Sequence, residues 1–269
     1  METQLQQKYN KLLNYLRSAG SLAVAFSGGV DSAFLVYAAH EALKDKLLAI
    51  TAVTQSYPCH EAADAAKILS QYGVRHVQIT LDQLAVPGFC ENGAERCYYC
   101  KYALFSKIKE AAQKQGISLV ADGANTDDEN DYRPGMRATA ELGILSPLRR
   151  AGFSKQDIRE VSKELGIFTW NKPSYACLAS RIPYGEEITA EKLAMVERAE
   201  QELLDMGFKE MRVRCHGKLA RIEVAESDFE KAVVHRKEIA AAVKNAGFLY
   251  AALDLEGFRS GSLNIALKK

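Results

Sequence analysis

A phosphate-binding loop is indicated by the residue types of one short segment, Ser27-Gly28-Gly29-Val30-Asp31-Ser32. Two glycines let backbone N–H groups approach a phosphate closely, and the N-terminus of a following helix adds positive potential. The hydroxyls of Ser27 and Ser32 can donate to the same oxygens, and Asp31 can orient a donor or help to hold Mg²⁺. The lysine of a Gly-Lys-Ser/Thr ending is missing, and no Gly-x-Gly-x-x-Gly follows. The segment therefore predicts a nucleotide-phosphate site that is neither a Walker A loop nor a dinucleotide fold.

Three cysteines form a second group with evident chemistry. Cys97 and Cys100 make a C-x-x-C pair that opens a predicted helix, and Cys177 lies in a later loop. Thiols at i and i+3 on one helical turn can bind one metal centre. A redox pair leaves the third cysteine unused, and a structural zinc needs a fourth ligand, for which the candidates are His60, Cys215 and His216. A [4Fe–4S] cluster with three cysteine ligands leaves one iron open. These interpretations stay open, as does a buried pair without a ligand. The isolated cysteines are expected to be packing residues: Cys59, Cys90 and Cys215.

A third group could bind the phosphate of a nucleotide, because arginine can hold a phosphate through two hydrogen bonds. Its members are Ser180, Arg181, Arg212 and Arg214. The alternative for these residues, including the Arg-x-Arg strand, is ordinary surface charge.

The elements that must position these residues alternate in the first half of the chain. Apolar stretches predict strands at 22–26, 47–53, 74–80 and 117–121, and helices are predicted at 4–18, 31–43, 60–71 and 99–115. This order is typical of a parallel, doubly wound sheet, which binds ligands at the carboxyl ends of its strands. The turn after Phe26, the segment after Val53 and the loop after Ala121 should meet there.

The second half has a different pattern. Residues 122–152 are expected to be irregular, and a helix over 154–165 has Ser154 as its N-cap. A loop follows, and then an α-β-β-α-β-β order predicts helices at 189–206 and 228–244. The predicted strands are 210–214, 219–224, 248–253 and 263–267. We therefore predict an α/β domain over 1–185 and a smaller α+β domain over 186–269.

Charge and hydropathy exclude several classes of protein. The 269 residues carry 35 Lys plus Arg and 34 Asp plus Glu, a formal net charge of +1. This balance lacks the basic excess of a general nucleic-acid binder. The N-terminus is too polar for a secretory signal, and no run of about 18 uncharged apolar residues could span a membrane. A cytoplasmic protein with reduced cysteines is expected.

The glycine loop resembles the pyrophosphate loop of the PP-loop ATP pyrophosphatases, which adenylate an oxygen of their substrate and release pyrophosphate. The resemblance implies that ATP and Mg²⁺ are bound and that Asp31 takes part in catalysis. It places the adenine near Ala52, Val53 and Thr54. It also places the nucleotide and its metal near Asp122, Gly123 and Asn125.

Further segments resemble one PP-loop family, the LarE-type ATP-dependent sulfur transferases. They are Arg96-Cys97-Tyr98-Tyr99-Cys100-Lys101, residues 122–128 and 131–135, the Cys177 segment through Gly185, and residues 212–216. The family implies a two-domain protomer, larger homo-oligomers and a pyridinium biscarboxylate mononucleotide, whose carboxylates become thiocarboxylates in nickel-pincer nucleotide biosynthesis. Three cysteines imply the cluster-dependent type, with [4Fe–4S] on Cys97, Cys100 and Cys177. Arg133 is implied as a further substrate anchor, and Glu200 as a magnesium ligand whose alternative is a solvated helix face.

Two other functions are considered. A tRNA thiolation enzyme also combines a PP-loop with three cysteines and a cluster, but the near-zero charge disfavours a tRNA substrate. A nucleotide-binding protein with structural zinc would bind ATP without releasing pyrophosphate. The expected partners are therefore a small nucleotide substrate, further copies of the chain and, transiently, other enzymes of the nickel-pincer pathway; neither nucleic acid nor a membrane is expected.

Overall fold

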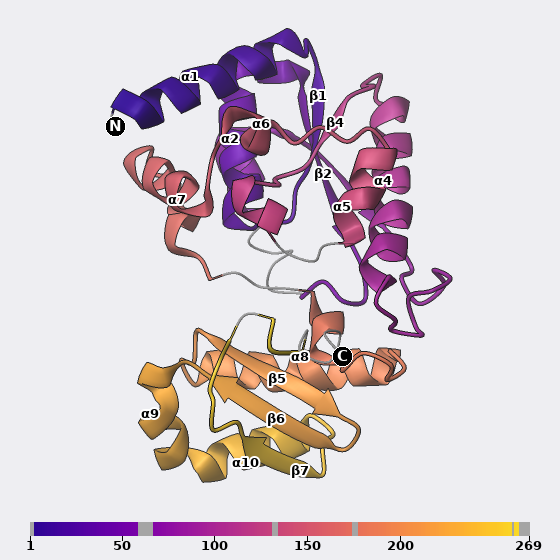
Figure 1. Ribbon diagram of the computed structural model, residues 1–269, viewed down its shortest axis with the longest axis vertical. Coiled ribbons are helices and arrows are strands. Elements are labelled where there is room, and N and C mark those ends of the chain that lie inside the picture. Colours follow the sequence, from indigo (N-terminus) through magenta and orange to yellow (C-terminus); the bar gives the residue numbers. More distant parts are fainter. Residues whose placement is uncertain (1–2, 59–66, 131–133, 174–176, 260, 264–269) are drawn as a thin grey trace. The chain divides into compact units, whose positions relative to one another are not determined.

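The computed structural model describes residues 3–58, 67–130, 134–173, 177–259 and 261–263. Two compact units divide the chain (Figure 1). The first comprises Met1–Asp82 and Cys97–Tyr175, and the second comprises Gln83–Arg96 and Ala176–Lys269.

The first unit is built on a parallel sheet with strand order β3-β2-β1-β4. Its strands are β1 (Leu22–Ala25), β2 (Leu47–Val53), β3 (Arg75–Thr80) and β4 (Val120–Ala121). β1 pairs with β2 and with β4, and β2 pairs with β3, all in parallel. The predicted doubly wound sheet is confirmed, with its two central strands reproduced to within one residue.

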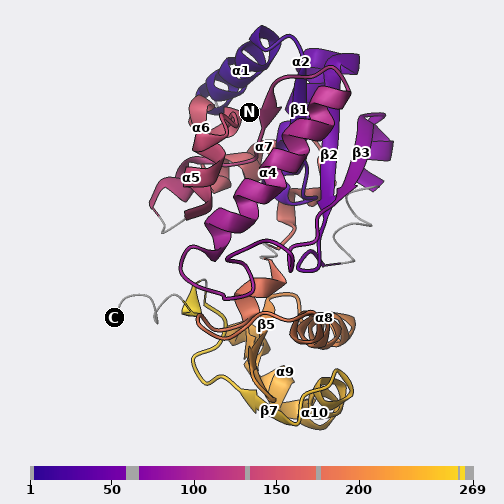
Figure 2. The same cartoon turned by 90° about the vertical axis from the view of Figure 1, so that its right-hand side faces the viewer.

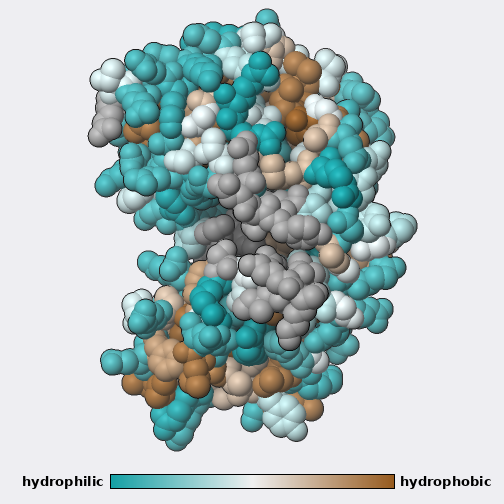
Figure 3. All heavy atoms as spheres, viewed as in Figure 1, coloured by the Kyte–Doolittle hydropathy of each residue, from teal (hydrophilic) through white to brown (hydrophobic). Residues whose placement is uncertain are grey.

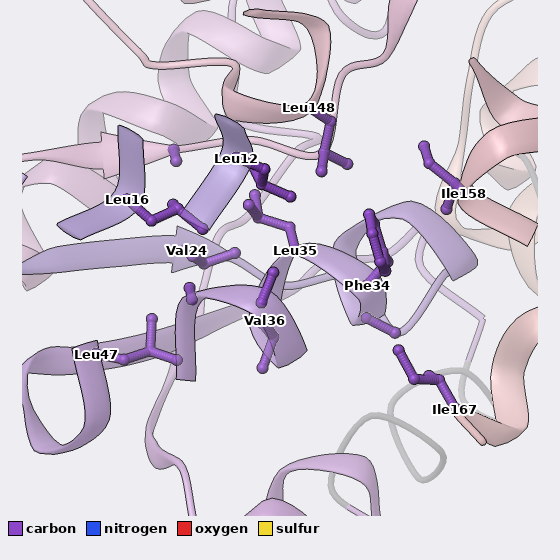
Figure 4. Close-up of a cluster of buried hydrophobic side chains, with 14 of the residues drawn as sticks. Leu12, Leu16, Val24, Phe34, Leu35, Val36, Leu47, Leu148, Ile158 and Ile167 are labelled. Atoms are coloured by element: carbon purple, nitrogen blue, oxygen red, sulfur yellow. The ribbon is translucent and has the colours of Figure 1, made fainter. Parts of the chain in front are cut away.

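Helices cover both faces of this sheet because successive residues of a strand point to opposite sides. Leu22 and Val24 of β1 pack with α1 (Thr3–Ser18) and α2 (Val30–Leu43), as Figure 4 shows for Val24 beside Leu12 and Leu35. Ala23 points the other way and joins the cluster that contains residues of α4 (Arg96–Lys114). Helices thus cover both faces of the sheet (Figure 2), which explains why β1 is apolar throughout and why β2 is apolar except at Thr51.

The region 122–152, predicted to be irregular, contains helices. They are a 3₁₀ turn at Thr126–Asn130, α5 (Pro134–Glu141) and α6 (Pro147–Ala151). Proline opens both α-helices, at the position where its missing N–H costs nothing. Helices of 8 and 5 residues are too short for a clear hydrophobic period, which explains the wrong prediction.

The predicted helix after this region is confirmed, together with its cap. α7 (Lys155–Glu164) begins with a capping box in which the Ser154 hydroxyl accepts from the Asp157 amide at 3.1 Å. The Asp157 carboxylate accepts in return from the Ser154 amide at 2.9 Å. Further 3₁₀ turns lie at Lys44–Lys46 and Phe168–Asn171. The helix predicted over 60–71 is described only from residue 67, where residues 67–72 are helical.

The second unit holds a three-stranded sheet of order β5-β6-β7. β5 (Met211–His216) and β6 (Leu219–Val224) are antiparallel, and β7 (Tyr250–Leu253) runs parallel to β6. Its helices are α8 (Ala190–Asp205), α9 (Phe229–Val234) and α10 (Arg236–Asn245), with 3₁₀ turns at Leu178–Arg181 and Glu226–Asp228. The helix predicted over 228–244 is thus broken at His235, and most of the strand predicted over 263–267 lies outside the described residues.

The units also divide the chain at different residues from the predicted boundary between 185 and 186. Residues 83–96 belong to the second unit, as do those from Ala176 onward. Backbone hydrogen bonds run from Gly185 to Asn92 and from Ile188 to Cys90. These bonds hold residues 83–96 to a chain segment that is nearly one hundred positions away, which no local pattern in the sequence reveals.

The surface is mainly hydrophilic on the face drawn in Figure 3, and apolar side chains form patches on both units. The large apolar residues that the second unit exposes include Val234, Leu249 and Leu255. Among the described helices, none combines the length and apolarity that crossing a membrane requires.

Candidate functional site

The predicted phosphate loop connects the end of β1 to the start of α2. Gly28 has a φ of 71°, a conformation that side chains rarely adopt, and Gly29 is the N-cap residue of α2. Gly29 has no side chain with which to cap the first helical turn. The amides of that turn therefore point toward the loop, where an anion can accept from them.

The two serines hold the loop in shape. The Ser32 hydroxyl donates to the Gly29 carbonyl at 3.1 Å and accepts from the Ser27 amide at 3.3 Å. The hydroxyl oxygens of Ser27 and Ser32 are 3.1 Å apart. Tyr57, which follows β2, donates from its hydroxyl to the Ser27 carbonyl at 2.9 Å. The loop is therefore ordered by its own hydrogen bonds before any ligand binds.

Asp31 lies in the first turn of α2 and is paired with Lys155. The Lys155 ammonium donates to Asp31 Oδ2 at 2.6 Å, and the Lys155 amide donates to Asp127 at 3.0 Å. The other oxygen, Oδ1, is buried and has no hydrogen-bond partner among the described residues. Burial raises the pKa of the Asp31 carboxyl, and the Lys155 charge opposes that rise. Lys155 thus brings to the loop the cation that the loop's own sequence lacks.

The loop after β4 packs directly on the same helical turn. A Cβ atom at Gly123 would lie 3.0 Å from the Ser32 amide nitrogen, so only glycine fits without a backbone shift. Asp122 is buried and accepts from the Ser146 hydroxyl at 2.8 Å, and burial raises its pKa. Asn125 is also buried and accepts from the Asp127 amide at 2.9 Å. The structure therefore brings Gly123 against the phosphate loop, and the predicted contact of Asp122, Gly123 and Asn125 with a nucleotide stays a prediction.

The last residues of β2 are less buried than the rest of the strand. Residues 47–51 are buried, whereas Ala52, Val53 and Thr54 are half-buried. β2 is the neighbour of β1 in the sheet, so these three residues lie at the carboxyl edge beside the loop. This position fits an adenine ring, whose contact with these residues stays a prediction.

The cysteines lie in different units. Cys97 and Cys100 are half-buried in the first turn of α4, which begins at Arg96, three residues before the predicted start. Cys177 belongs to the second unit, is exposed and precedes the 3₁₀ turn Leu178–Arg181. No group of three metal-ligating side chains occurs within the part of the chain that the structure describes. The predicted metal centre therefore stays a prediction.

The isolated cysteines and histidines behave as follows. The Cys90 thiol donates to the Leu84 carbonyl at 3.3 Å, and Cys215 is buried, which raises the pKa of its thiol. His216 has a pKa lowered by burial. Cys59 and His60, one of the predicted zinc ligands, lie outside the described residues.

A buried ion pair lies at the start of the second unit. The Arg181 guanidinium, 1% exposed, donates to both oxygens of Glu200, at 2.7 and 3.1 Å. Glu200 also accepts from the Val213 amide at 2.9 Å. The expected solvated helix face for Glu200 is wrong. Both carboxylate oxygens accept hydrogen bonds from Arg181, and a magnesium ion on Glu200 stays a prediction.

Arg214 is the centre of a second buried cluster. It donates to Glu223 at 2.6 Å, to the Ser262 hydroxyl at 2.9 Å and to the Ser180 carbonyl at 3.1 Å. Its Nε is buried without a partner among the described residues. The Ser180 hydroxyl in turn accepts from Arg181 at 2.8 Å. The structure therefore places Ser180, Arg181 and Arg214 together, and the alternative of ordinary surface charge is wrong for both arginines.

Arg212 shares a face of β5 with Arg214, because the two are separated by one residue. Its guanidinium carbon lies 4.7 Å from the centre of the Phe258 ring. Nη1 also donates to the Met211 carbonyl at 2.6 Å. Only 6% of Arg212 is exposed, which again contradicts ordinary surface charge. Arg133, the remaining predicted anchor, lies outside the described residues.

Comparison with known proteins agrees with this geometry. A family described as a PP-loop domain matches residues 1–131. The pyridinium-3,5-bisthiocarboxylic acid mononucleotide synthase of Lactiplantibacillus plantarum is 36% identical over 98% of this chain and 96% of its own. The chain belongs to the LarE family of PP-loop proteins. Other relatives of this LarE-family chain are uncharacterized proteins from Synechocystis, 40% identical over 98% of this chain and all of theirs, and from Methanocaldococcus jannaschii, 32% identical over 94% and 98%.

Sequence reasoning missed two residues of this LarE-family site. Lys155 could have been suspected, since a lysine directly after a predicted N-cap lies in the first turn of a helix. Its pairing with Asp31, 124 positions away, has no local signal. Glu223 is equally hidden, because a glutamate in an alternating strand is normally exposed, yet here it is fully buried between Arg214 and Arg221.

Proposed function

We propose that the protein is an ATP-dependent sulfur transferase that converts a carboxylate of pyridinium-3,5-biscarboxylate mononucleotide into a thiocarboxylate, in the cytoplasm, during nickel-pincer nucleotide biosynthesis. The observation that carries this proposal is the similarity to the bisthiocarboxylic acid mononucleotide synthase over nearly the whole of both chains. The PP-loop domain gives the ATP half of the reaction independent support.

ATP binds at the carboxyl edge of the parallel sheet in this proposal. The first-turn amides of α2 and the hydroxyls of Ser27 and Ser32 hold the β and γ phosphates. Asp31 fits a magnesium ion, because its Oδ1 is buried and lacks a partner among the described residues. Lys155 neutralises the other Asp31 oxygen and can turn to a phosphate when the metal binds.

Adenylation solves the chemical difficulty of the substrate. A carboxylate is a poor electrophile, whereas its mixed anhydride with AMP has a good leaving group. The carboxylate oxygen attacks the α phosphorus, pyrophosphate leaves, and a sulfur nucleophile then displaces AMP from the carbonyl carbon. The residues at the phosphate loop serve the first step by holding the two phosphates that depart.

Sulfur delivery is assigned to Cys97, Cys100 and Cys177 in this proposal. Cys97 and Cys100 fit a shared metal centre, since they are three apart in the first turn of α4 and only half-buried. Cys177 is exposed and accessible to a ligand. A [4Fe–4S] cluster on these three thiols would supply an open iron that can bind an additional sulfide. A structural zinc at the same cysteines is the competing assignment.

The substrate phosphate is assigned to Ser180, Arg181, Arg212 and Arg214, with Arg133 as a further anchor. Two buried arginines, Arg181 and Arg214, contact Ser180, and the buried Nε of Arg214 lacks an acceptor among the described residues, which supports a donor site for an anion. This assignment gives the ATP chemistry to the first unit, and the substrate phosphate mainly to residues of the second unit, which includes Ser180 and Arg181. It also includes homo-oligomers, for which the exposed apolar residues of the second unit provide surface, and transient contact with other pathway enzymes.

The test uses protein purified without oxygen, supplied with MgATP, sulfide and the biscarboxylate mononucleotide. Mass spectrometry should detect replacement of carboxylate oxygen by sulfur, with AMP formed in equal amount. A parallel reaction with tRNA in physiological salt should yield no thiolated nucleoside. Thiolated tRNA, or ATP binding without any AMP, would replace the proposal by one of the two alternatives.

The sulfur route needs a separate test. Iron and sulfide should be present in the anaerobic protein, and Cys97→Ala, Cys100→Ala and Cys177→Ala should each lose both while retaining ATP binding. Cys90→Ala is the matched control, since its half-buried thiol donates to the Leu84 carbonyl at 3.3 Å and is not one of the three proposed ligands. Zinc in place of iron, or a Cys177 that loses its sulfur after one turnover, would overturn the cluster assignment.

A further inference from the structure

Asn92 has an unusual backbone conformation for a residue in a loop of the second unit. Its φ is 52°, and Lys44 is the other non-glycine residue with positive φ among the residues described. Asparagine tolerates this conformation better than most residues. Asn92 is also completely buried. A buried polar residue in this conformation needs partners that account for both features.

The Asn92 side chain provides those partners. Its Nδ2 faces three backbone carbonyls, those of Ile182 at 3.2 Å, Pro183 at 2.7 Å and Glu186 at 2.9 Å. The Asn92 carbonyl accepts from the Gly185 amide at 3.0 Å. An amide nitrogen carries two hydrogens, so its whole donor capacity is committed to one short stretch of chain.

Arg96 completes the arrangement from the end of the same segment. Its Nη1 donates to Asn92 Oδ1 at 2.5 Å and to the Ala179 carbonyl at 3.0 Å. The guanidinium carbon lies 5.2 Å from the centre of the Tyr184 ring, and 5% of the residue is exposed. We call Asn92 and Arg96 the loop clasp.

The loop clasp binds a segment that has little regular secondary structure. Residues 178–181 form a 3₁₀ turn, and residues 182–188 contain turns and bends but neither helix nor strand. The clasp donates to the carbonyls of Ile182 and Glu186, and it adds a second donor to those of Ala179 and Pro183, which also accept from the Ile182 and Glu186 amides. The held carbonyls also lie close to the residues of the proposed site. Ala179 directly precedes Ser180, which contacts both Arg181 and Arg214.

We propose that Asn92 and Arg96 are positioning residues that fix the chain around Ser180 and Arg181 for the phosphate of the mononucleotide. The inference rests on the proposed function, because it takes the phosphate anchors from there. Ser180 is held from two sides: its neighbour Ala179 is bound by Arg96, and its own carbonyl and hydroxyl are bound by arginines. The clasp therefore fixes the backbone next to Ser180, whose hydroxyl accepts from Arg181.

The same clasp acts on both cysteine segments through the chain. Arg96 is followed directly by Cys97, and Ala179 follows Cys177 by two residues. Moving the Arg96 guanidinium therefore disturbs the backbone beside both cysteines. Loss of the clasp should lower iron content as well as substrate affinity, while the phosphate loop at β1 and α2 shares no hydrogen bond with either residue among those described.

The test compares variants that remove the clasp without forcing the backbone. Asn92→Gly keeps the positive φ and deletes the amide, and Arg96→Met removes the guanidinium without leaving a buried charge. Arg96→Lys keeps a cation that can donate to both oxygens, so it should rescue part of the loss. The matched controls are Lys44→Gly, at the other positive φ, and Arg150→Met, which removes an arginine stacked 4.6 Å from the Tyr15 ring.

Three quantities are measured on each whole protein, below its unfolding temperature. Affinity for the mononucleotide, titrated without ATP, should fall about tenfold to a hundredfold in Asn92→Gly and Arg96→Met. Hydrogen exchange should rise in residues 178–188. ATP affinity should stay close to that of the wild type, and the controls should change neither affinity nor exchange.

The outcomes separate the two proposals. Faster exchange in 178–188 with unchanged mononucleotide affinity would make the clasp purely structural and overturn the inference. Equal losses of ATP and mononucleotide affinity would also overturn it. A wild-type protein that binds the mononucleotide but never thiolates it would refute the proposed function alone, since the clasp is judged by binding. A wild type that does not bind it would refute both.

Discussion

The two proposed anion sites are built in different ways. In the first unit the proposed site is mostly backbone: six consecutive residues and one glycine from the loop after β4, with small hydroxyls closing the turn. In the second unit the proposed site consists of side chains, which come from a 3₁₀ turn, α8, β5 and β6 and form buried ion pairs. The first site should therefore be sensitive to added side-chain volume, and the second to the removal of a charged side chain.

The largest effect should follow from removing a buried charge in the second unit. Glu200→Ala leaves Arg181 buried and unpaired and the Val213 amide without its acceptor, so we expect a loss of about 3–5 kcal/mol in the free energy of unfolding. Urea denaturation measures it. The matched control is Glu110→Ala, whose pair with Lys114 is exposed and should hardly matter. Similar losses in both variants would contradict the difference between the units.

A volume change should dominate in the first unit. Gly123→Ala puts a Cβ 3.0 Å from the Ser32 amide nitrogen and must move the first turn of α2. We expect ATP affinity to fall about tenfold, or roughly 1.4 kcal/mol. Gly93→Ala is the control, because nothing lies within 4 Å of its added Cβ. Calorimetric titration with ATP measures both variants, and normal affinity in Gly123→Ala would show that the loop is not held by this contact.

The smallest expected effect is on the pH dependence of stability, and it comes from the Asp31 carboxylate in the first unit. Burial raises the pKa of Asp31 above its ordinary value of 3.8, so the folded state holds this proton more tightly than the unfolded state. The stability from this group is therefore complete below pH 3.8 and is lost as pH rises through the folded pKa. Asp31→Asn lacks this loss and should gain stability relative to the wild type across that window.

Denaturation at a series of pH values, without nucleotide or metal, checks this prediction. Lys155 is 31% exposed on its side chain, so it can reach water when its partner is neutral. A stability difference that does not change with pH would mean that the ion pair with Lys155 fully offsets the burial of Asp31.

The same contrast explains what the sequence could predict. The phosphate loop, its strand and its helix are contiguous, so glycine chemistry and hydrophobic pattern located them closely. The cysteine pair was placed at a helix start for the same reason. Other contacts of the sites join residues that are distant in the chain, namely Lys155 with Asp31, Glu200 with Arg181 and the two residues of the loop clasp with their carbonyls. Which polar residues make such contacts depends on which of them are buried, and residue type alone does not reveal that.

The short helices were not predicted, and the predicted boundary differs from that of the units, for related reasons. α5 and α6 carry too few turns to show a period, although their opening prolines were a usable signal. Residues 83–96 follow a predicted strand and precede a predicted helix of the first unit, so chain order assigned them there. In the structure, hydrogen bonds from Asn92 to residues 182–186 hold this segment in the second unit instead.

The central claim is that a substrate carboxylate is adenylated before sulfur replaces its oxygen. The most direct test supplies the biscarboxylate mononucleotide with oxygen-18 in its carboxylates, together with MgATP and sulfide. The attacking oxygen stays on phosphorus when AMP leaves, so the account predicts AMP that carries one labelled oxygen for each thiocarboxylate formed. Unlabelled AMP beside a thiolated product, or ADP and orthophosphate in place of AMP and pyrophosphate, would contradict it.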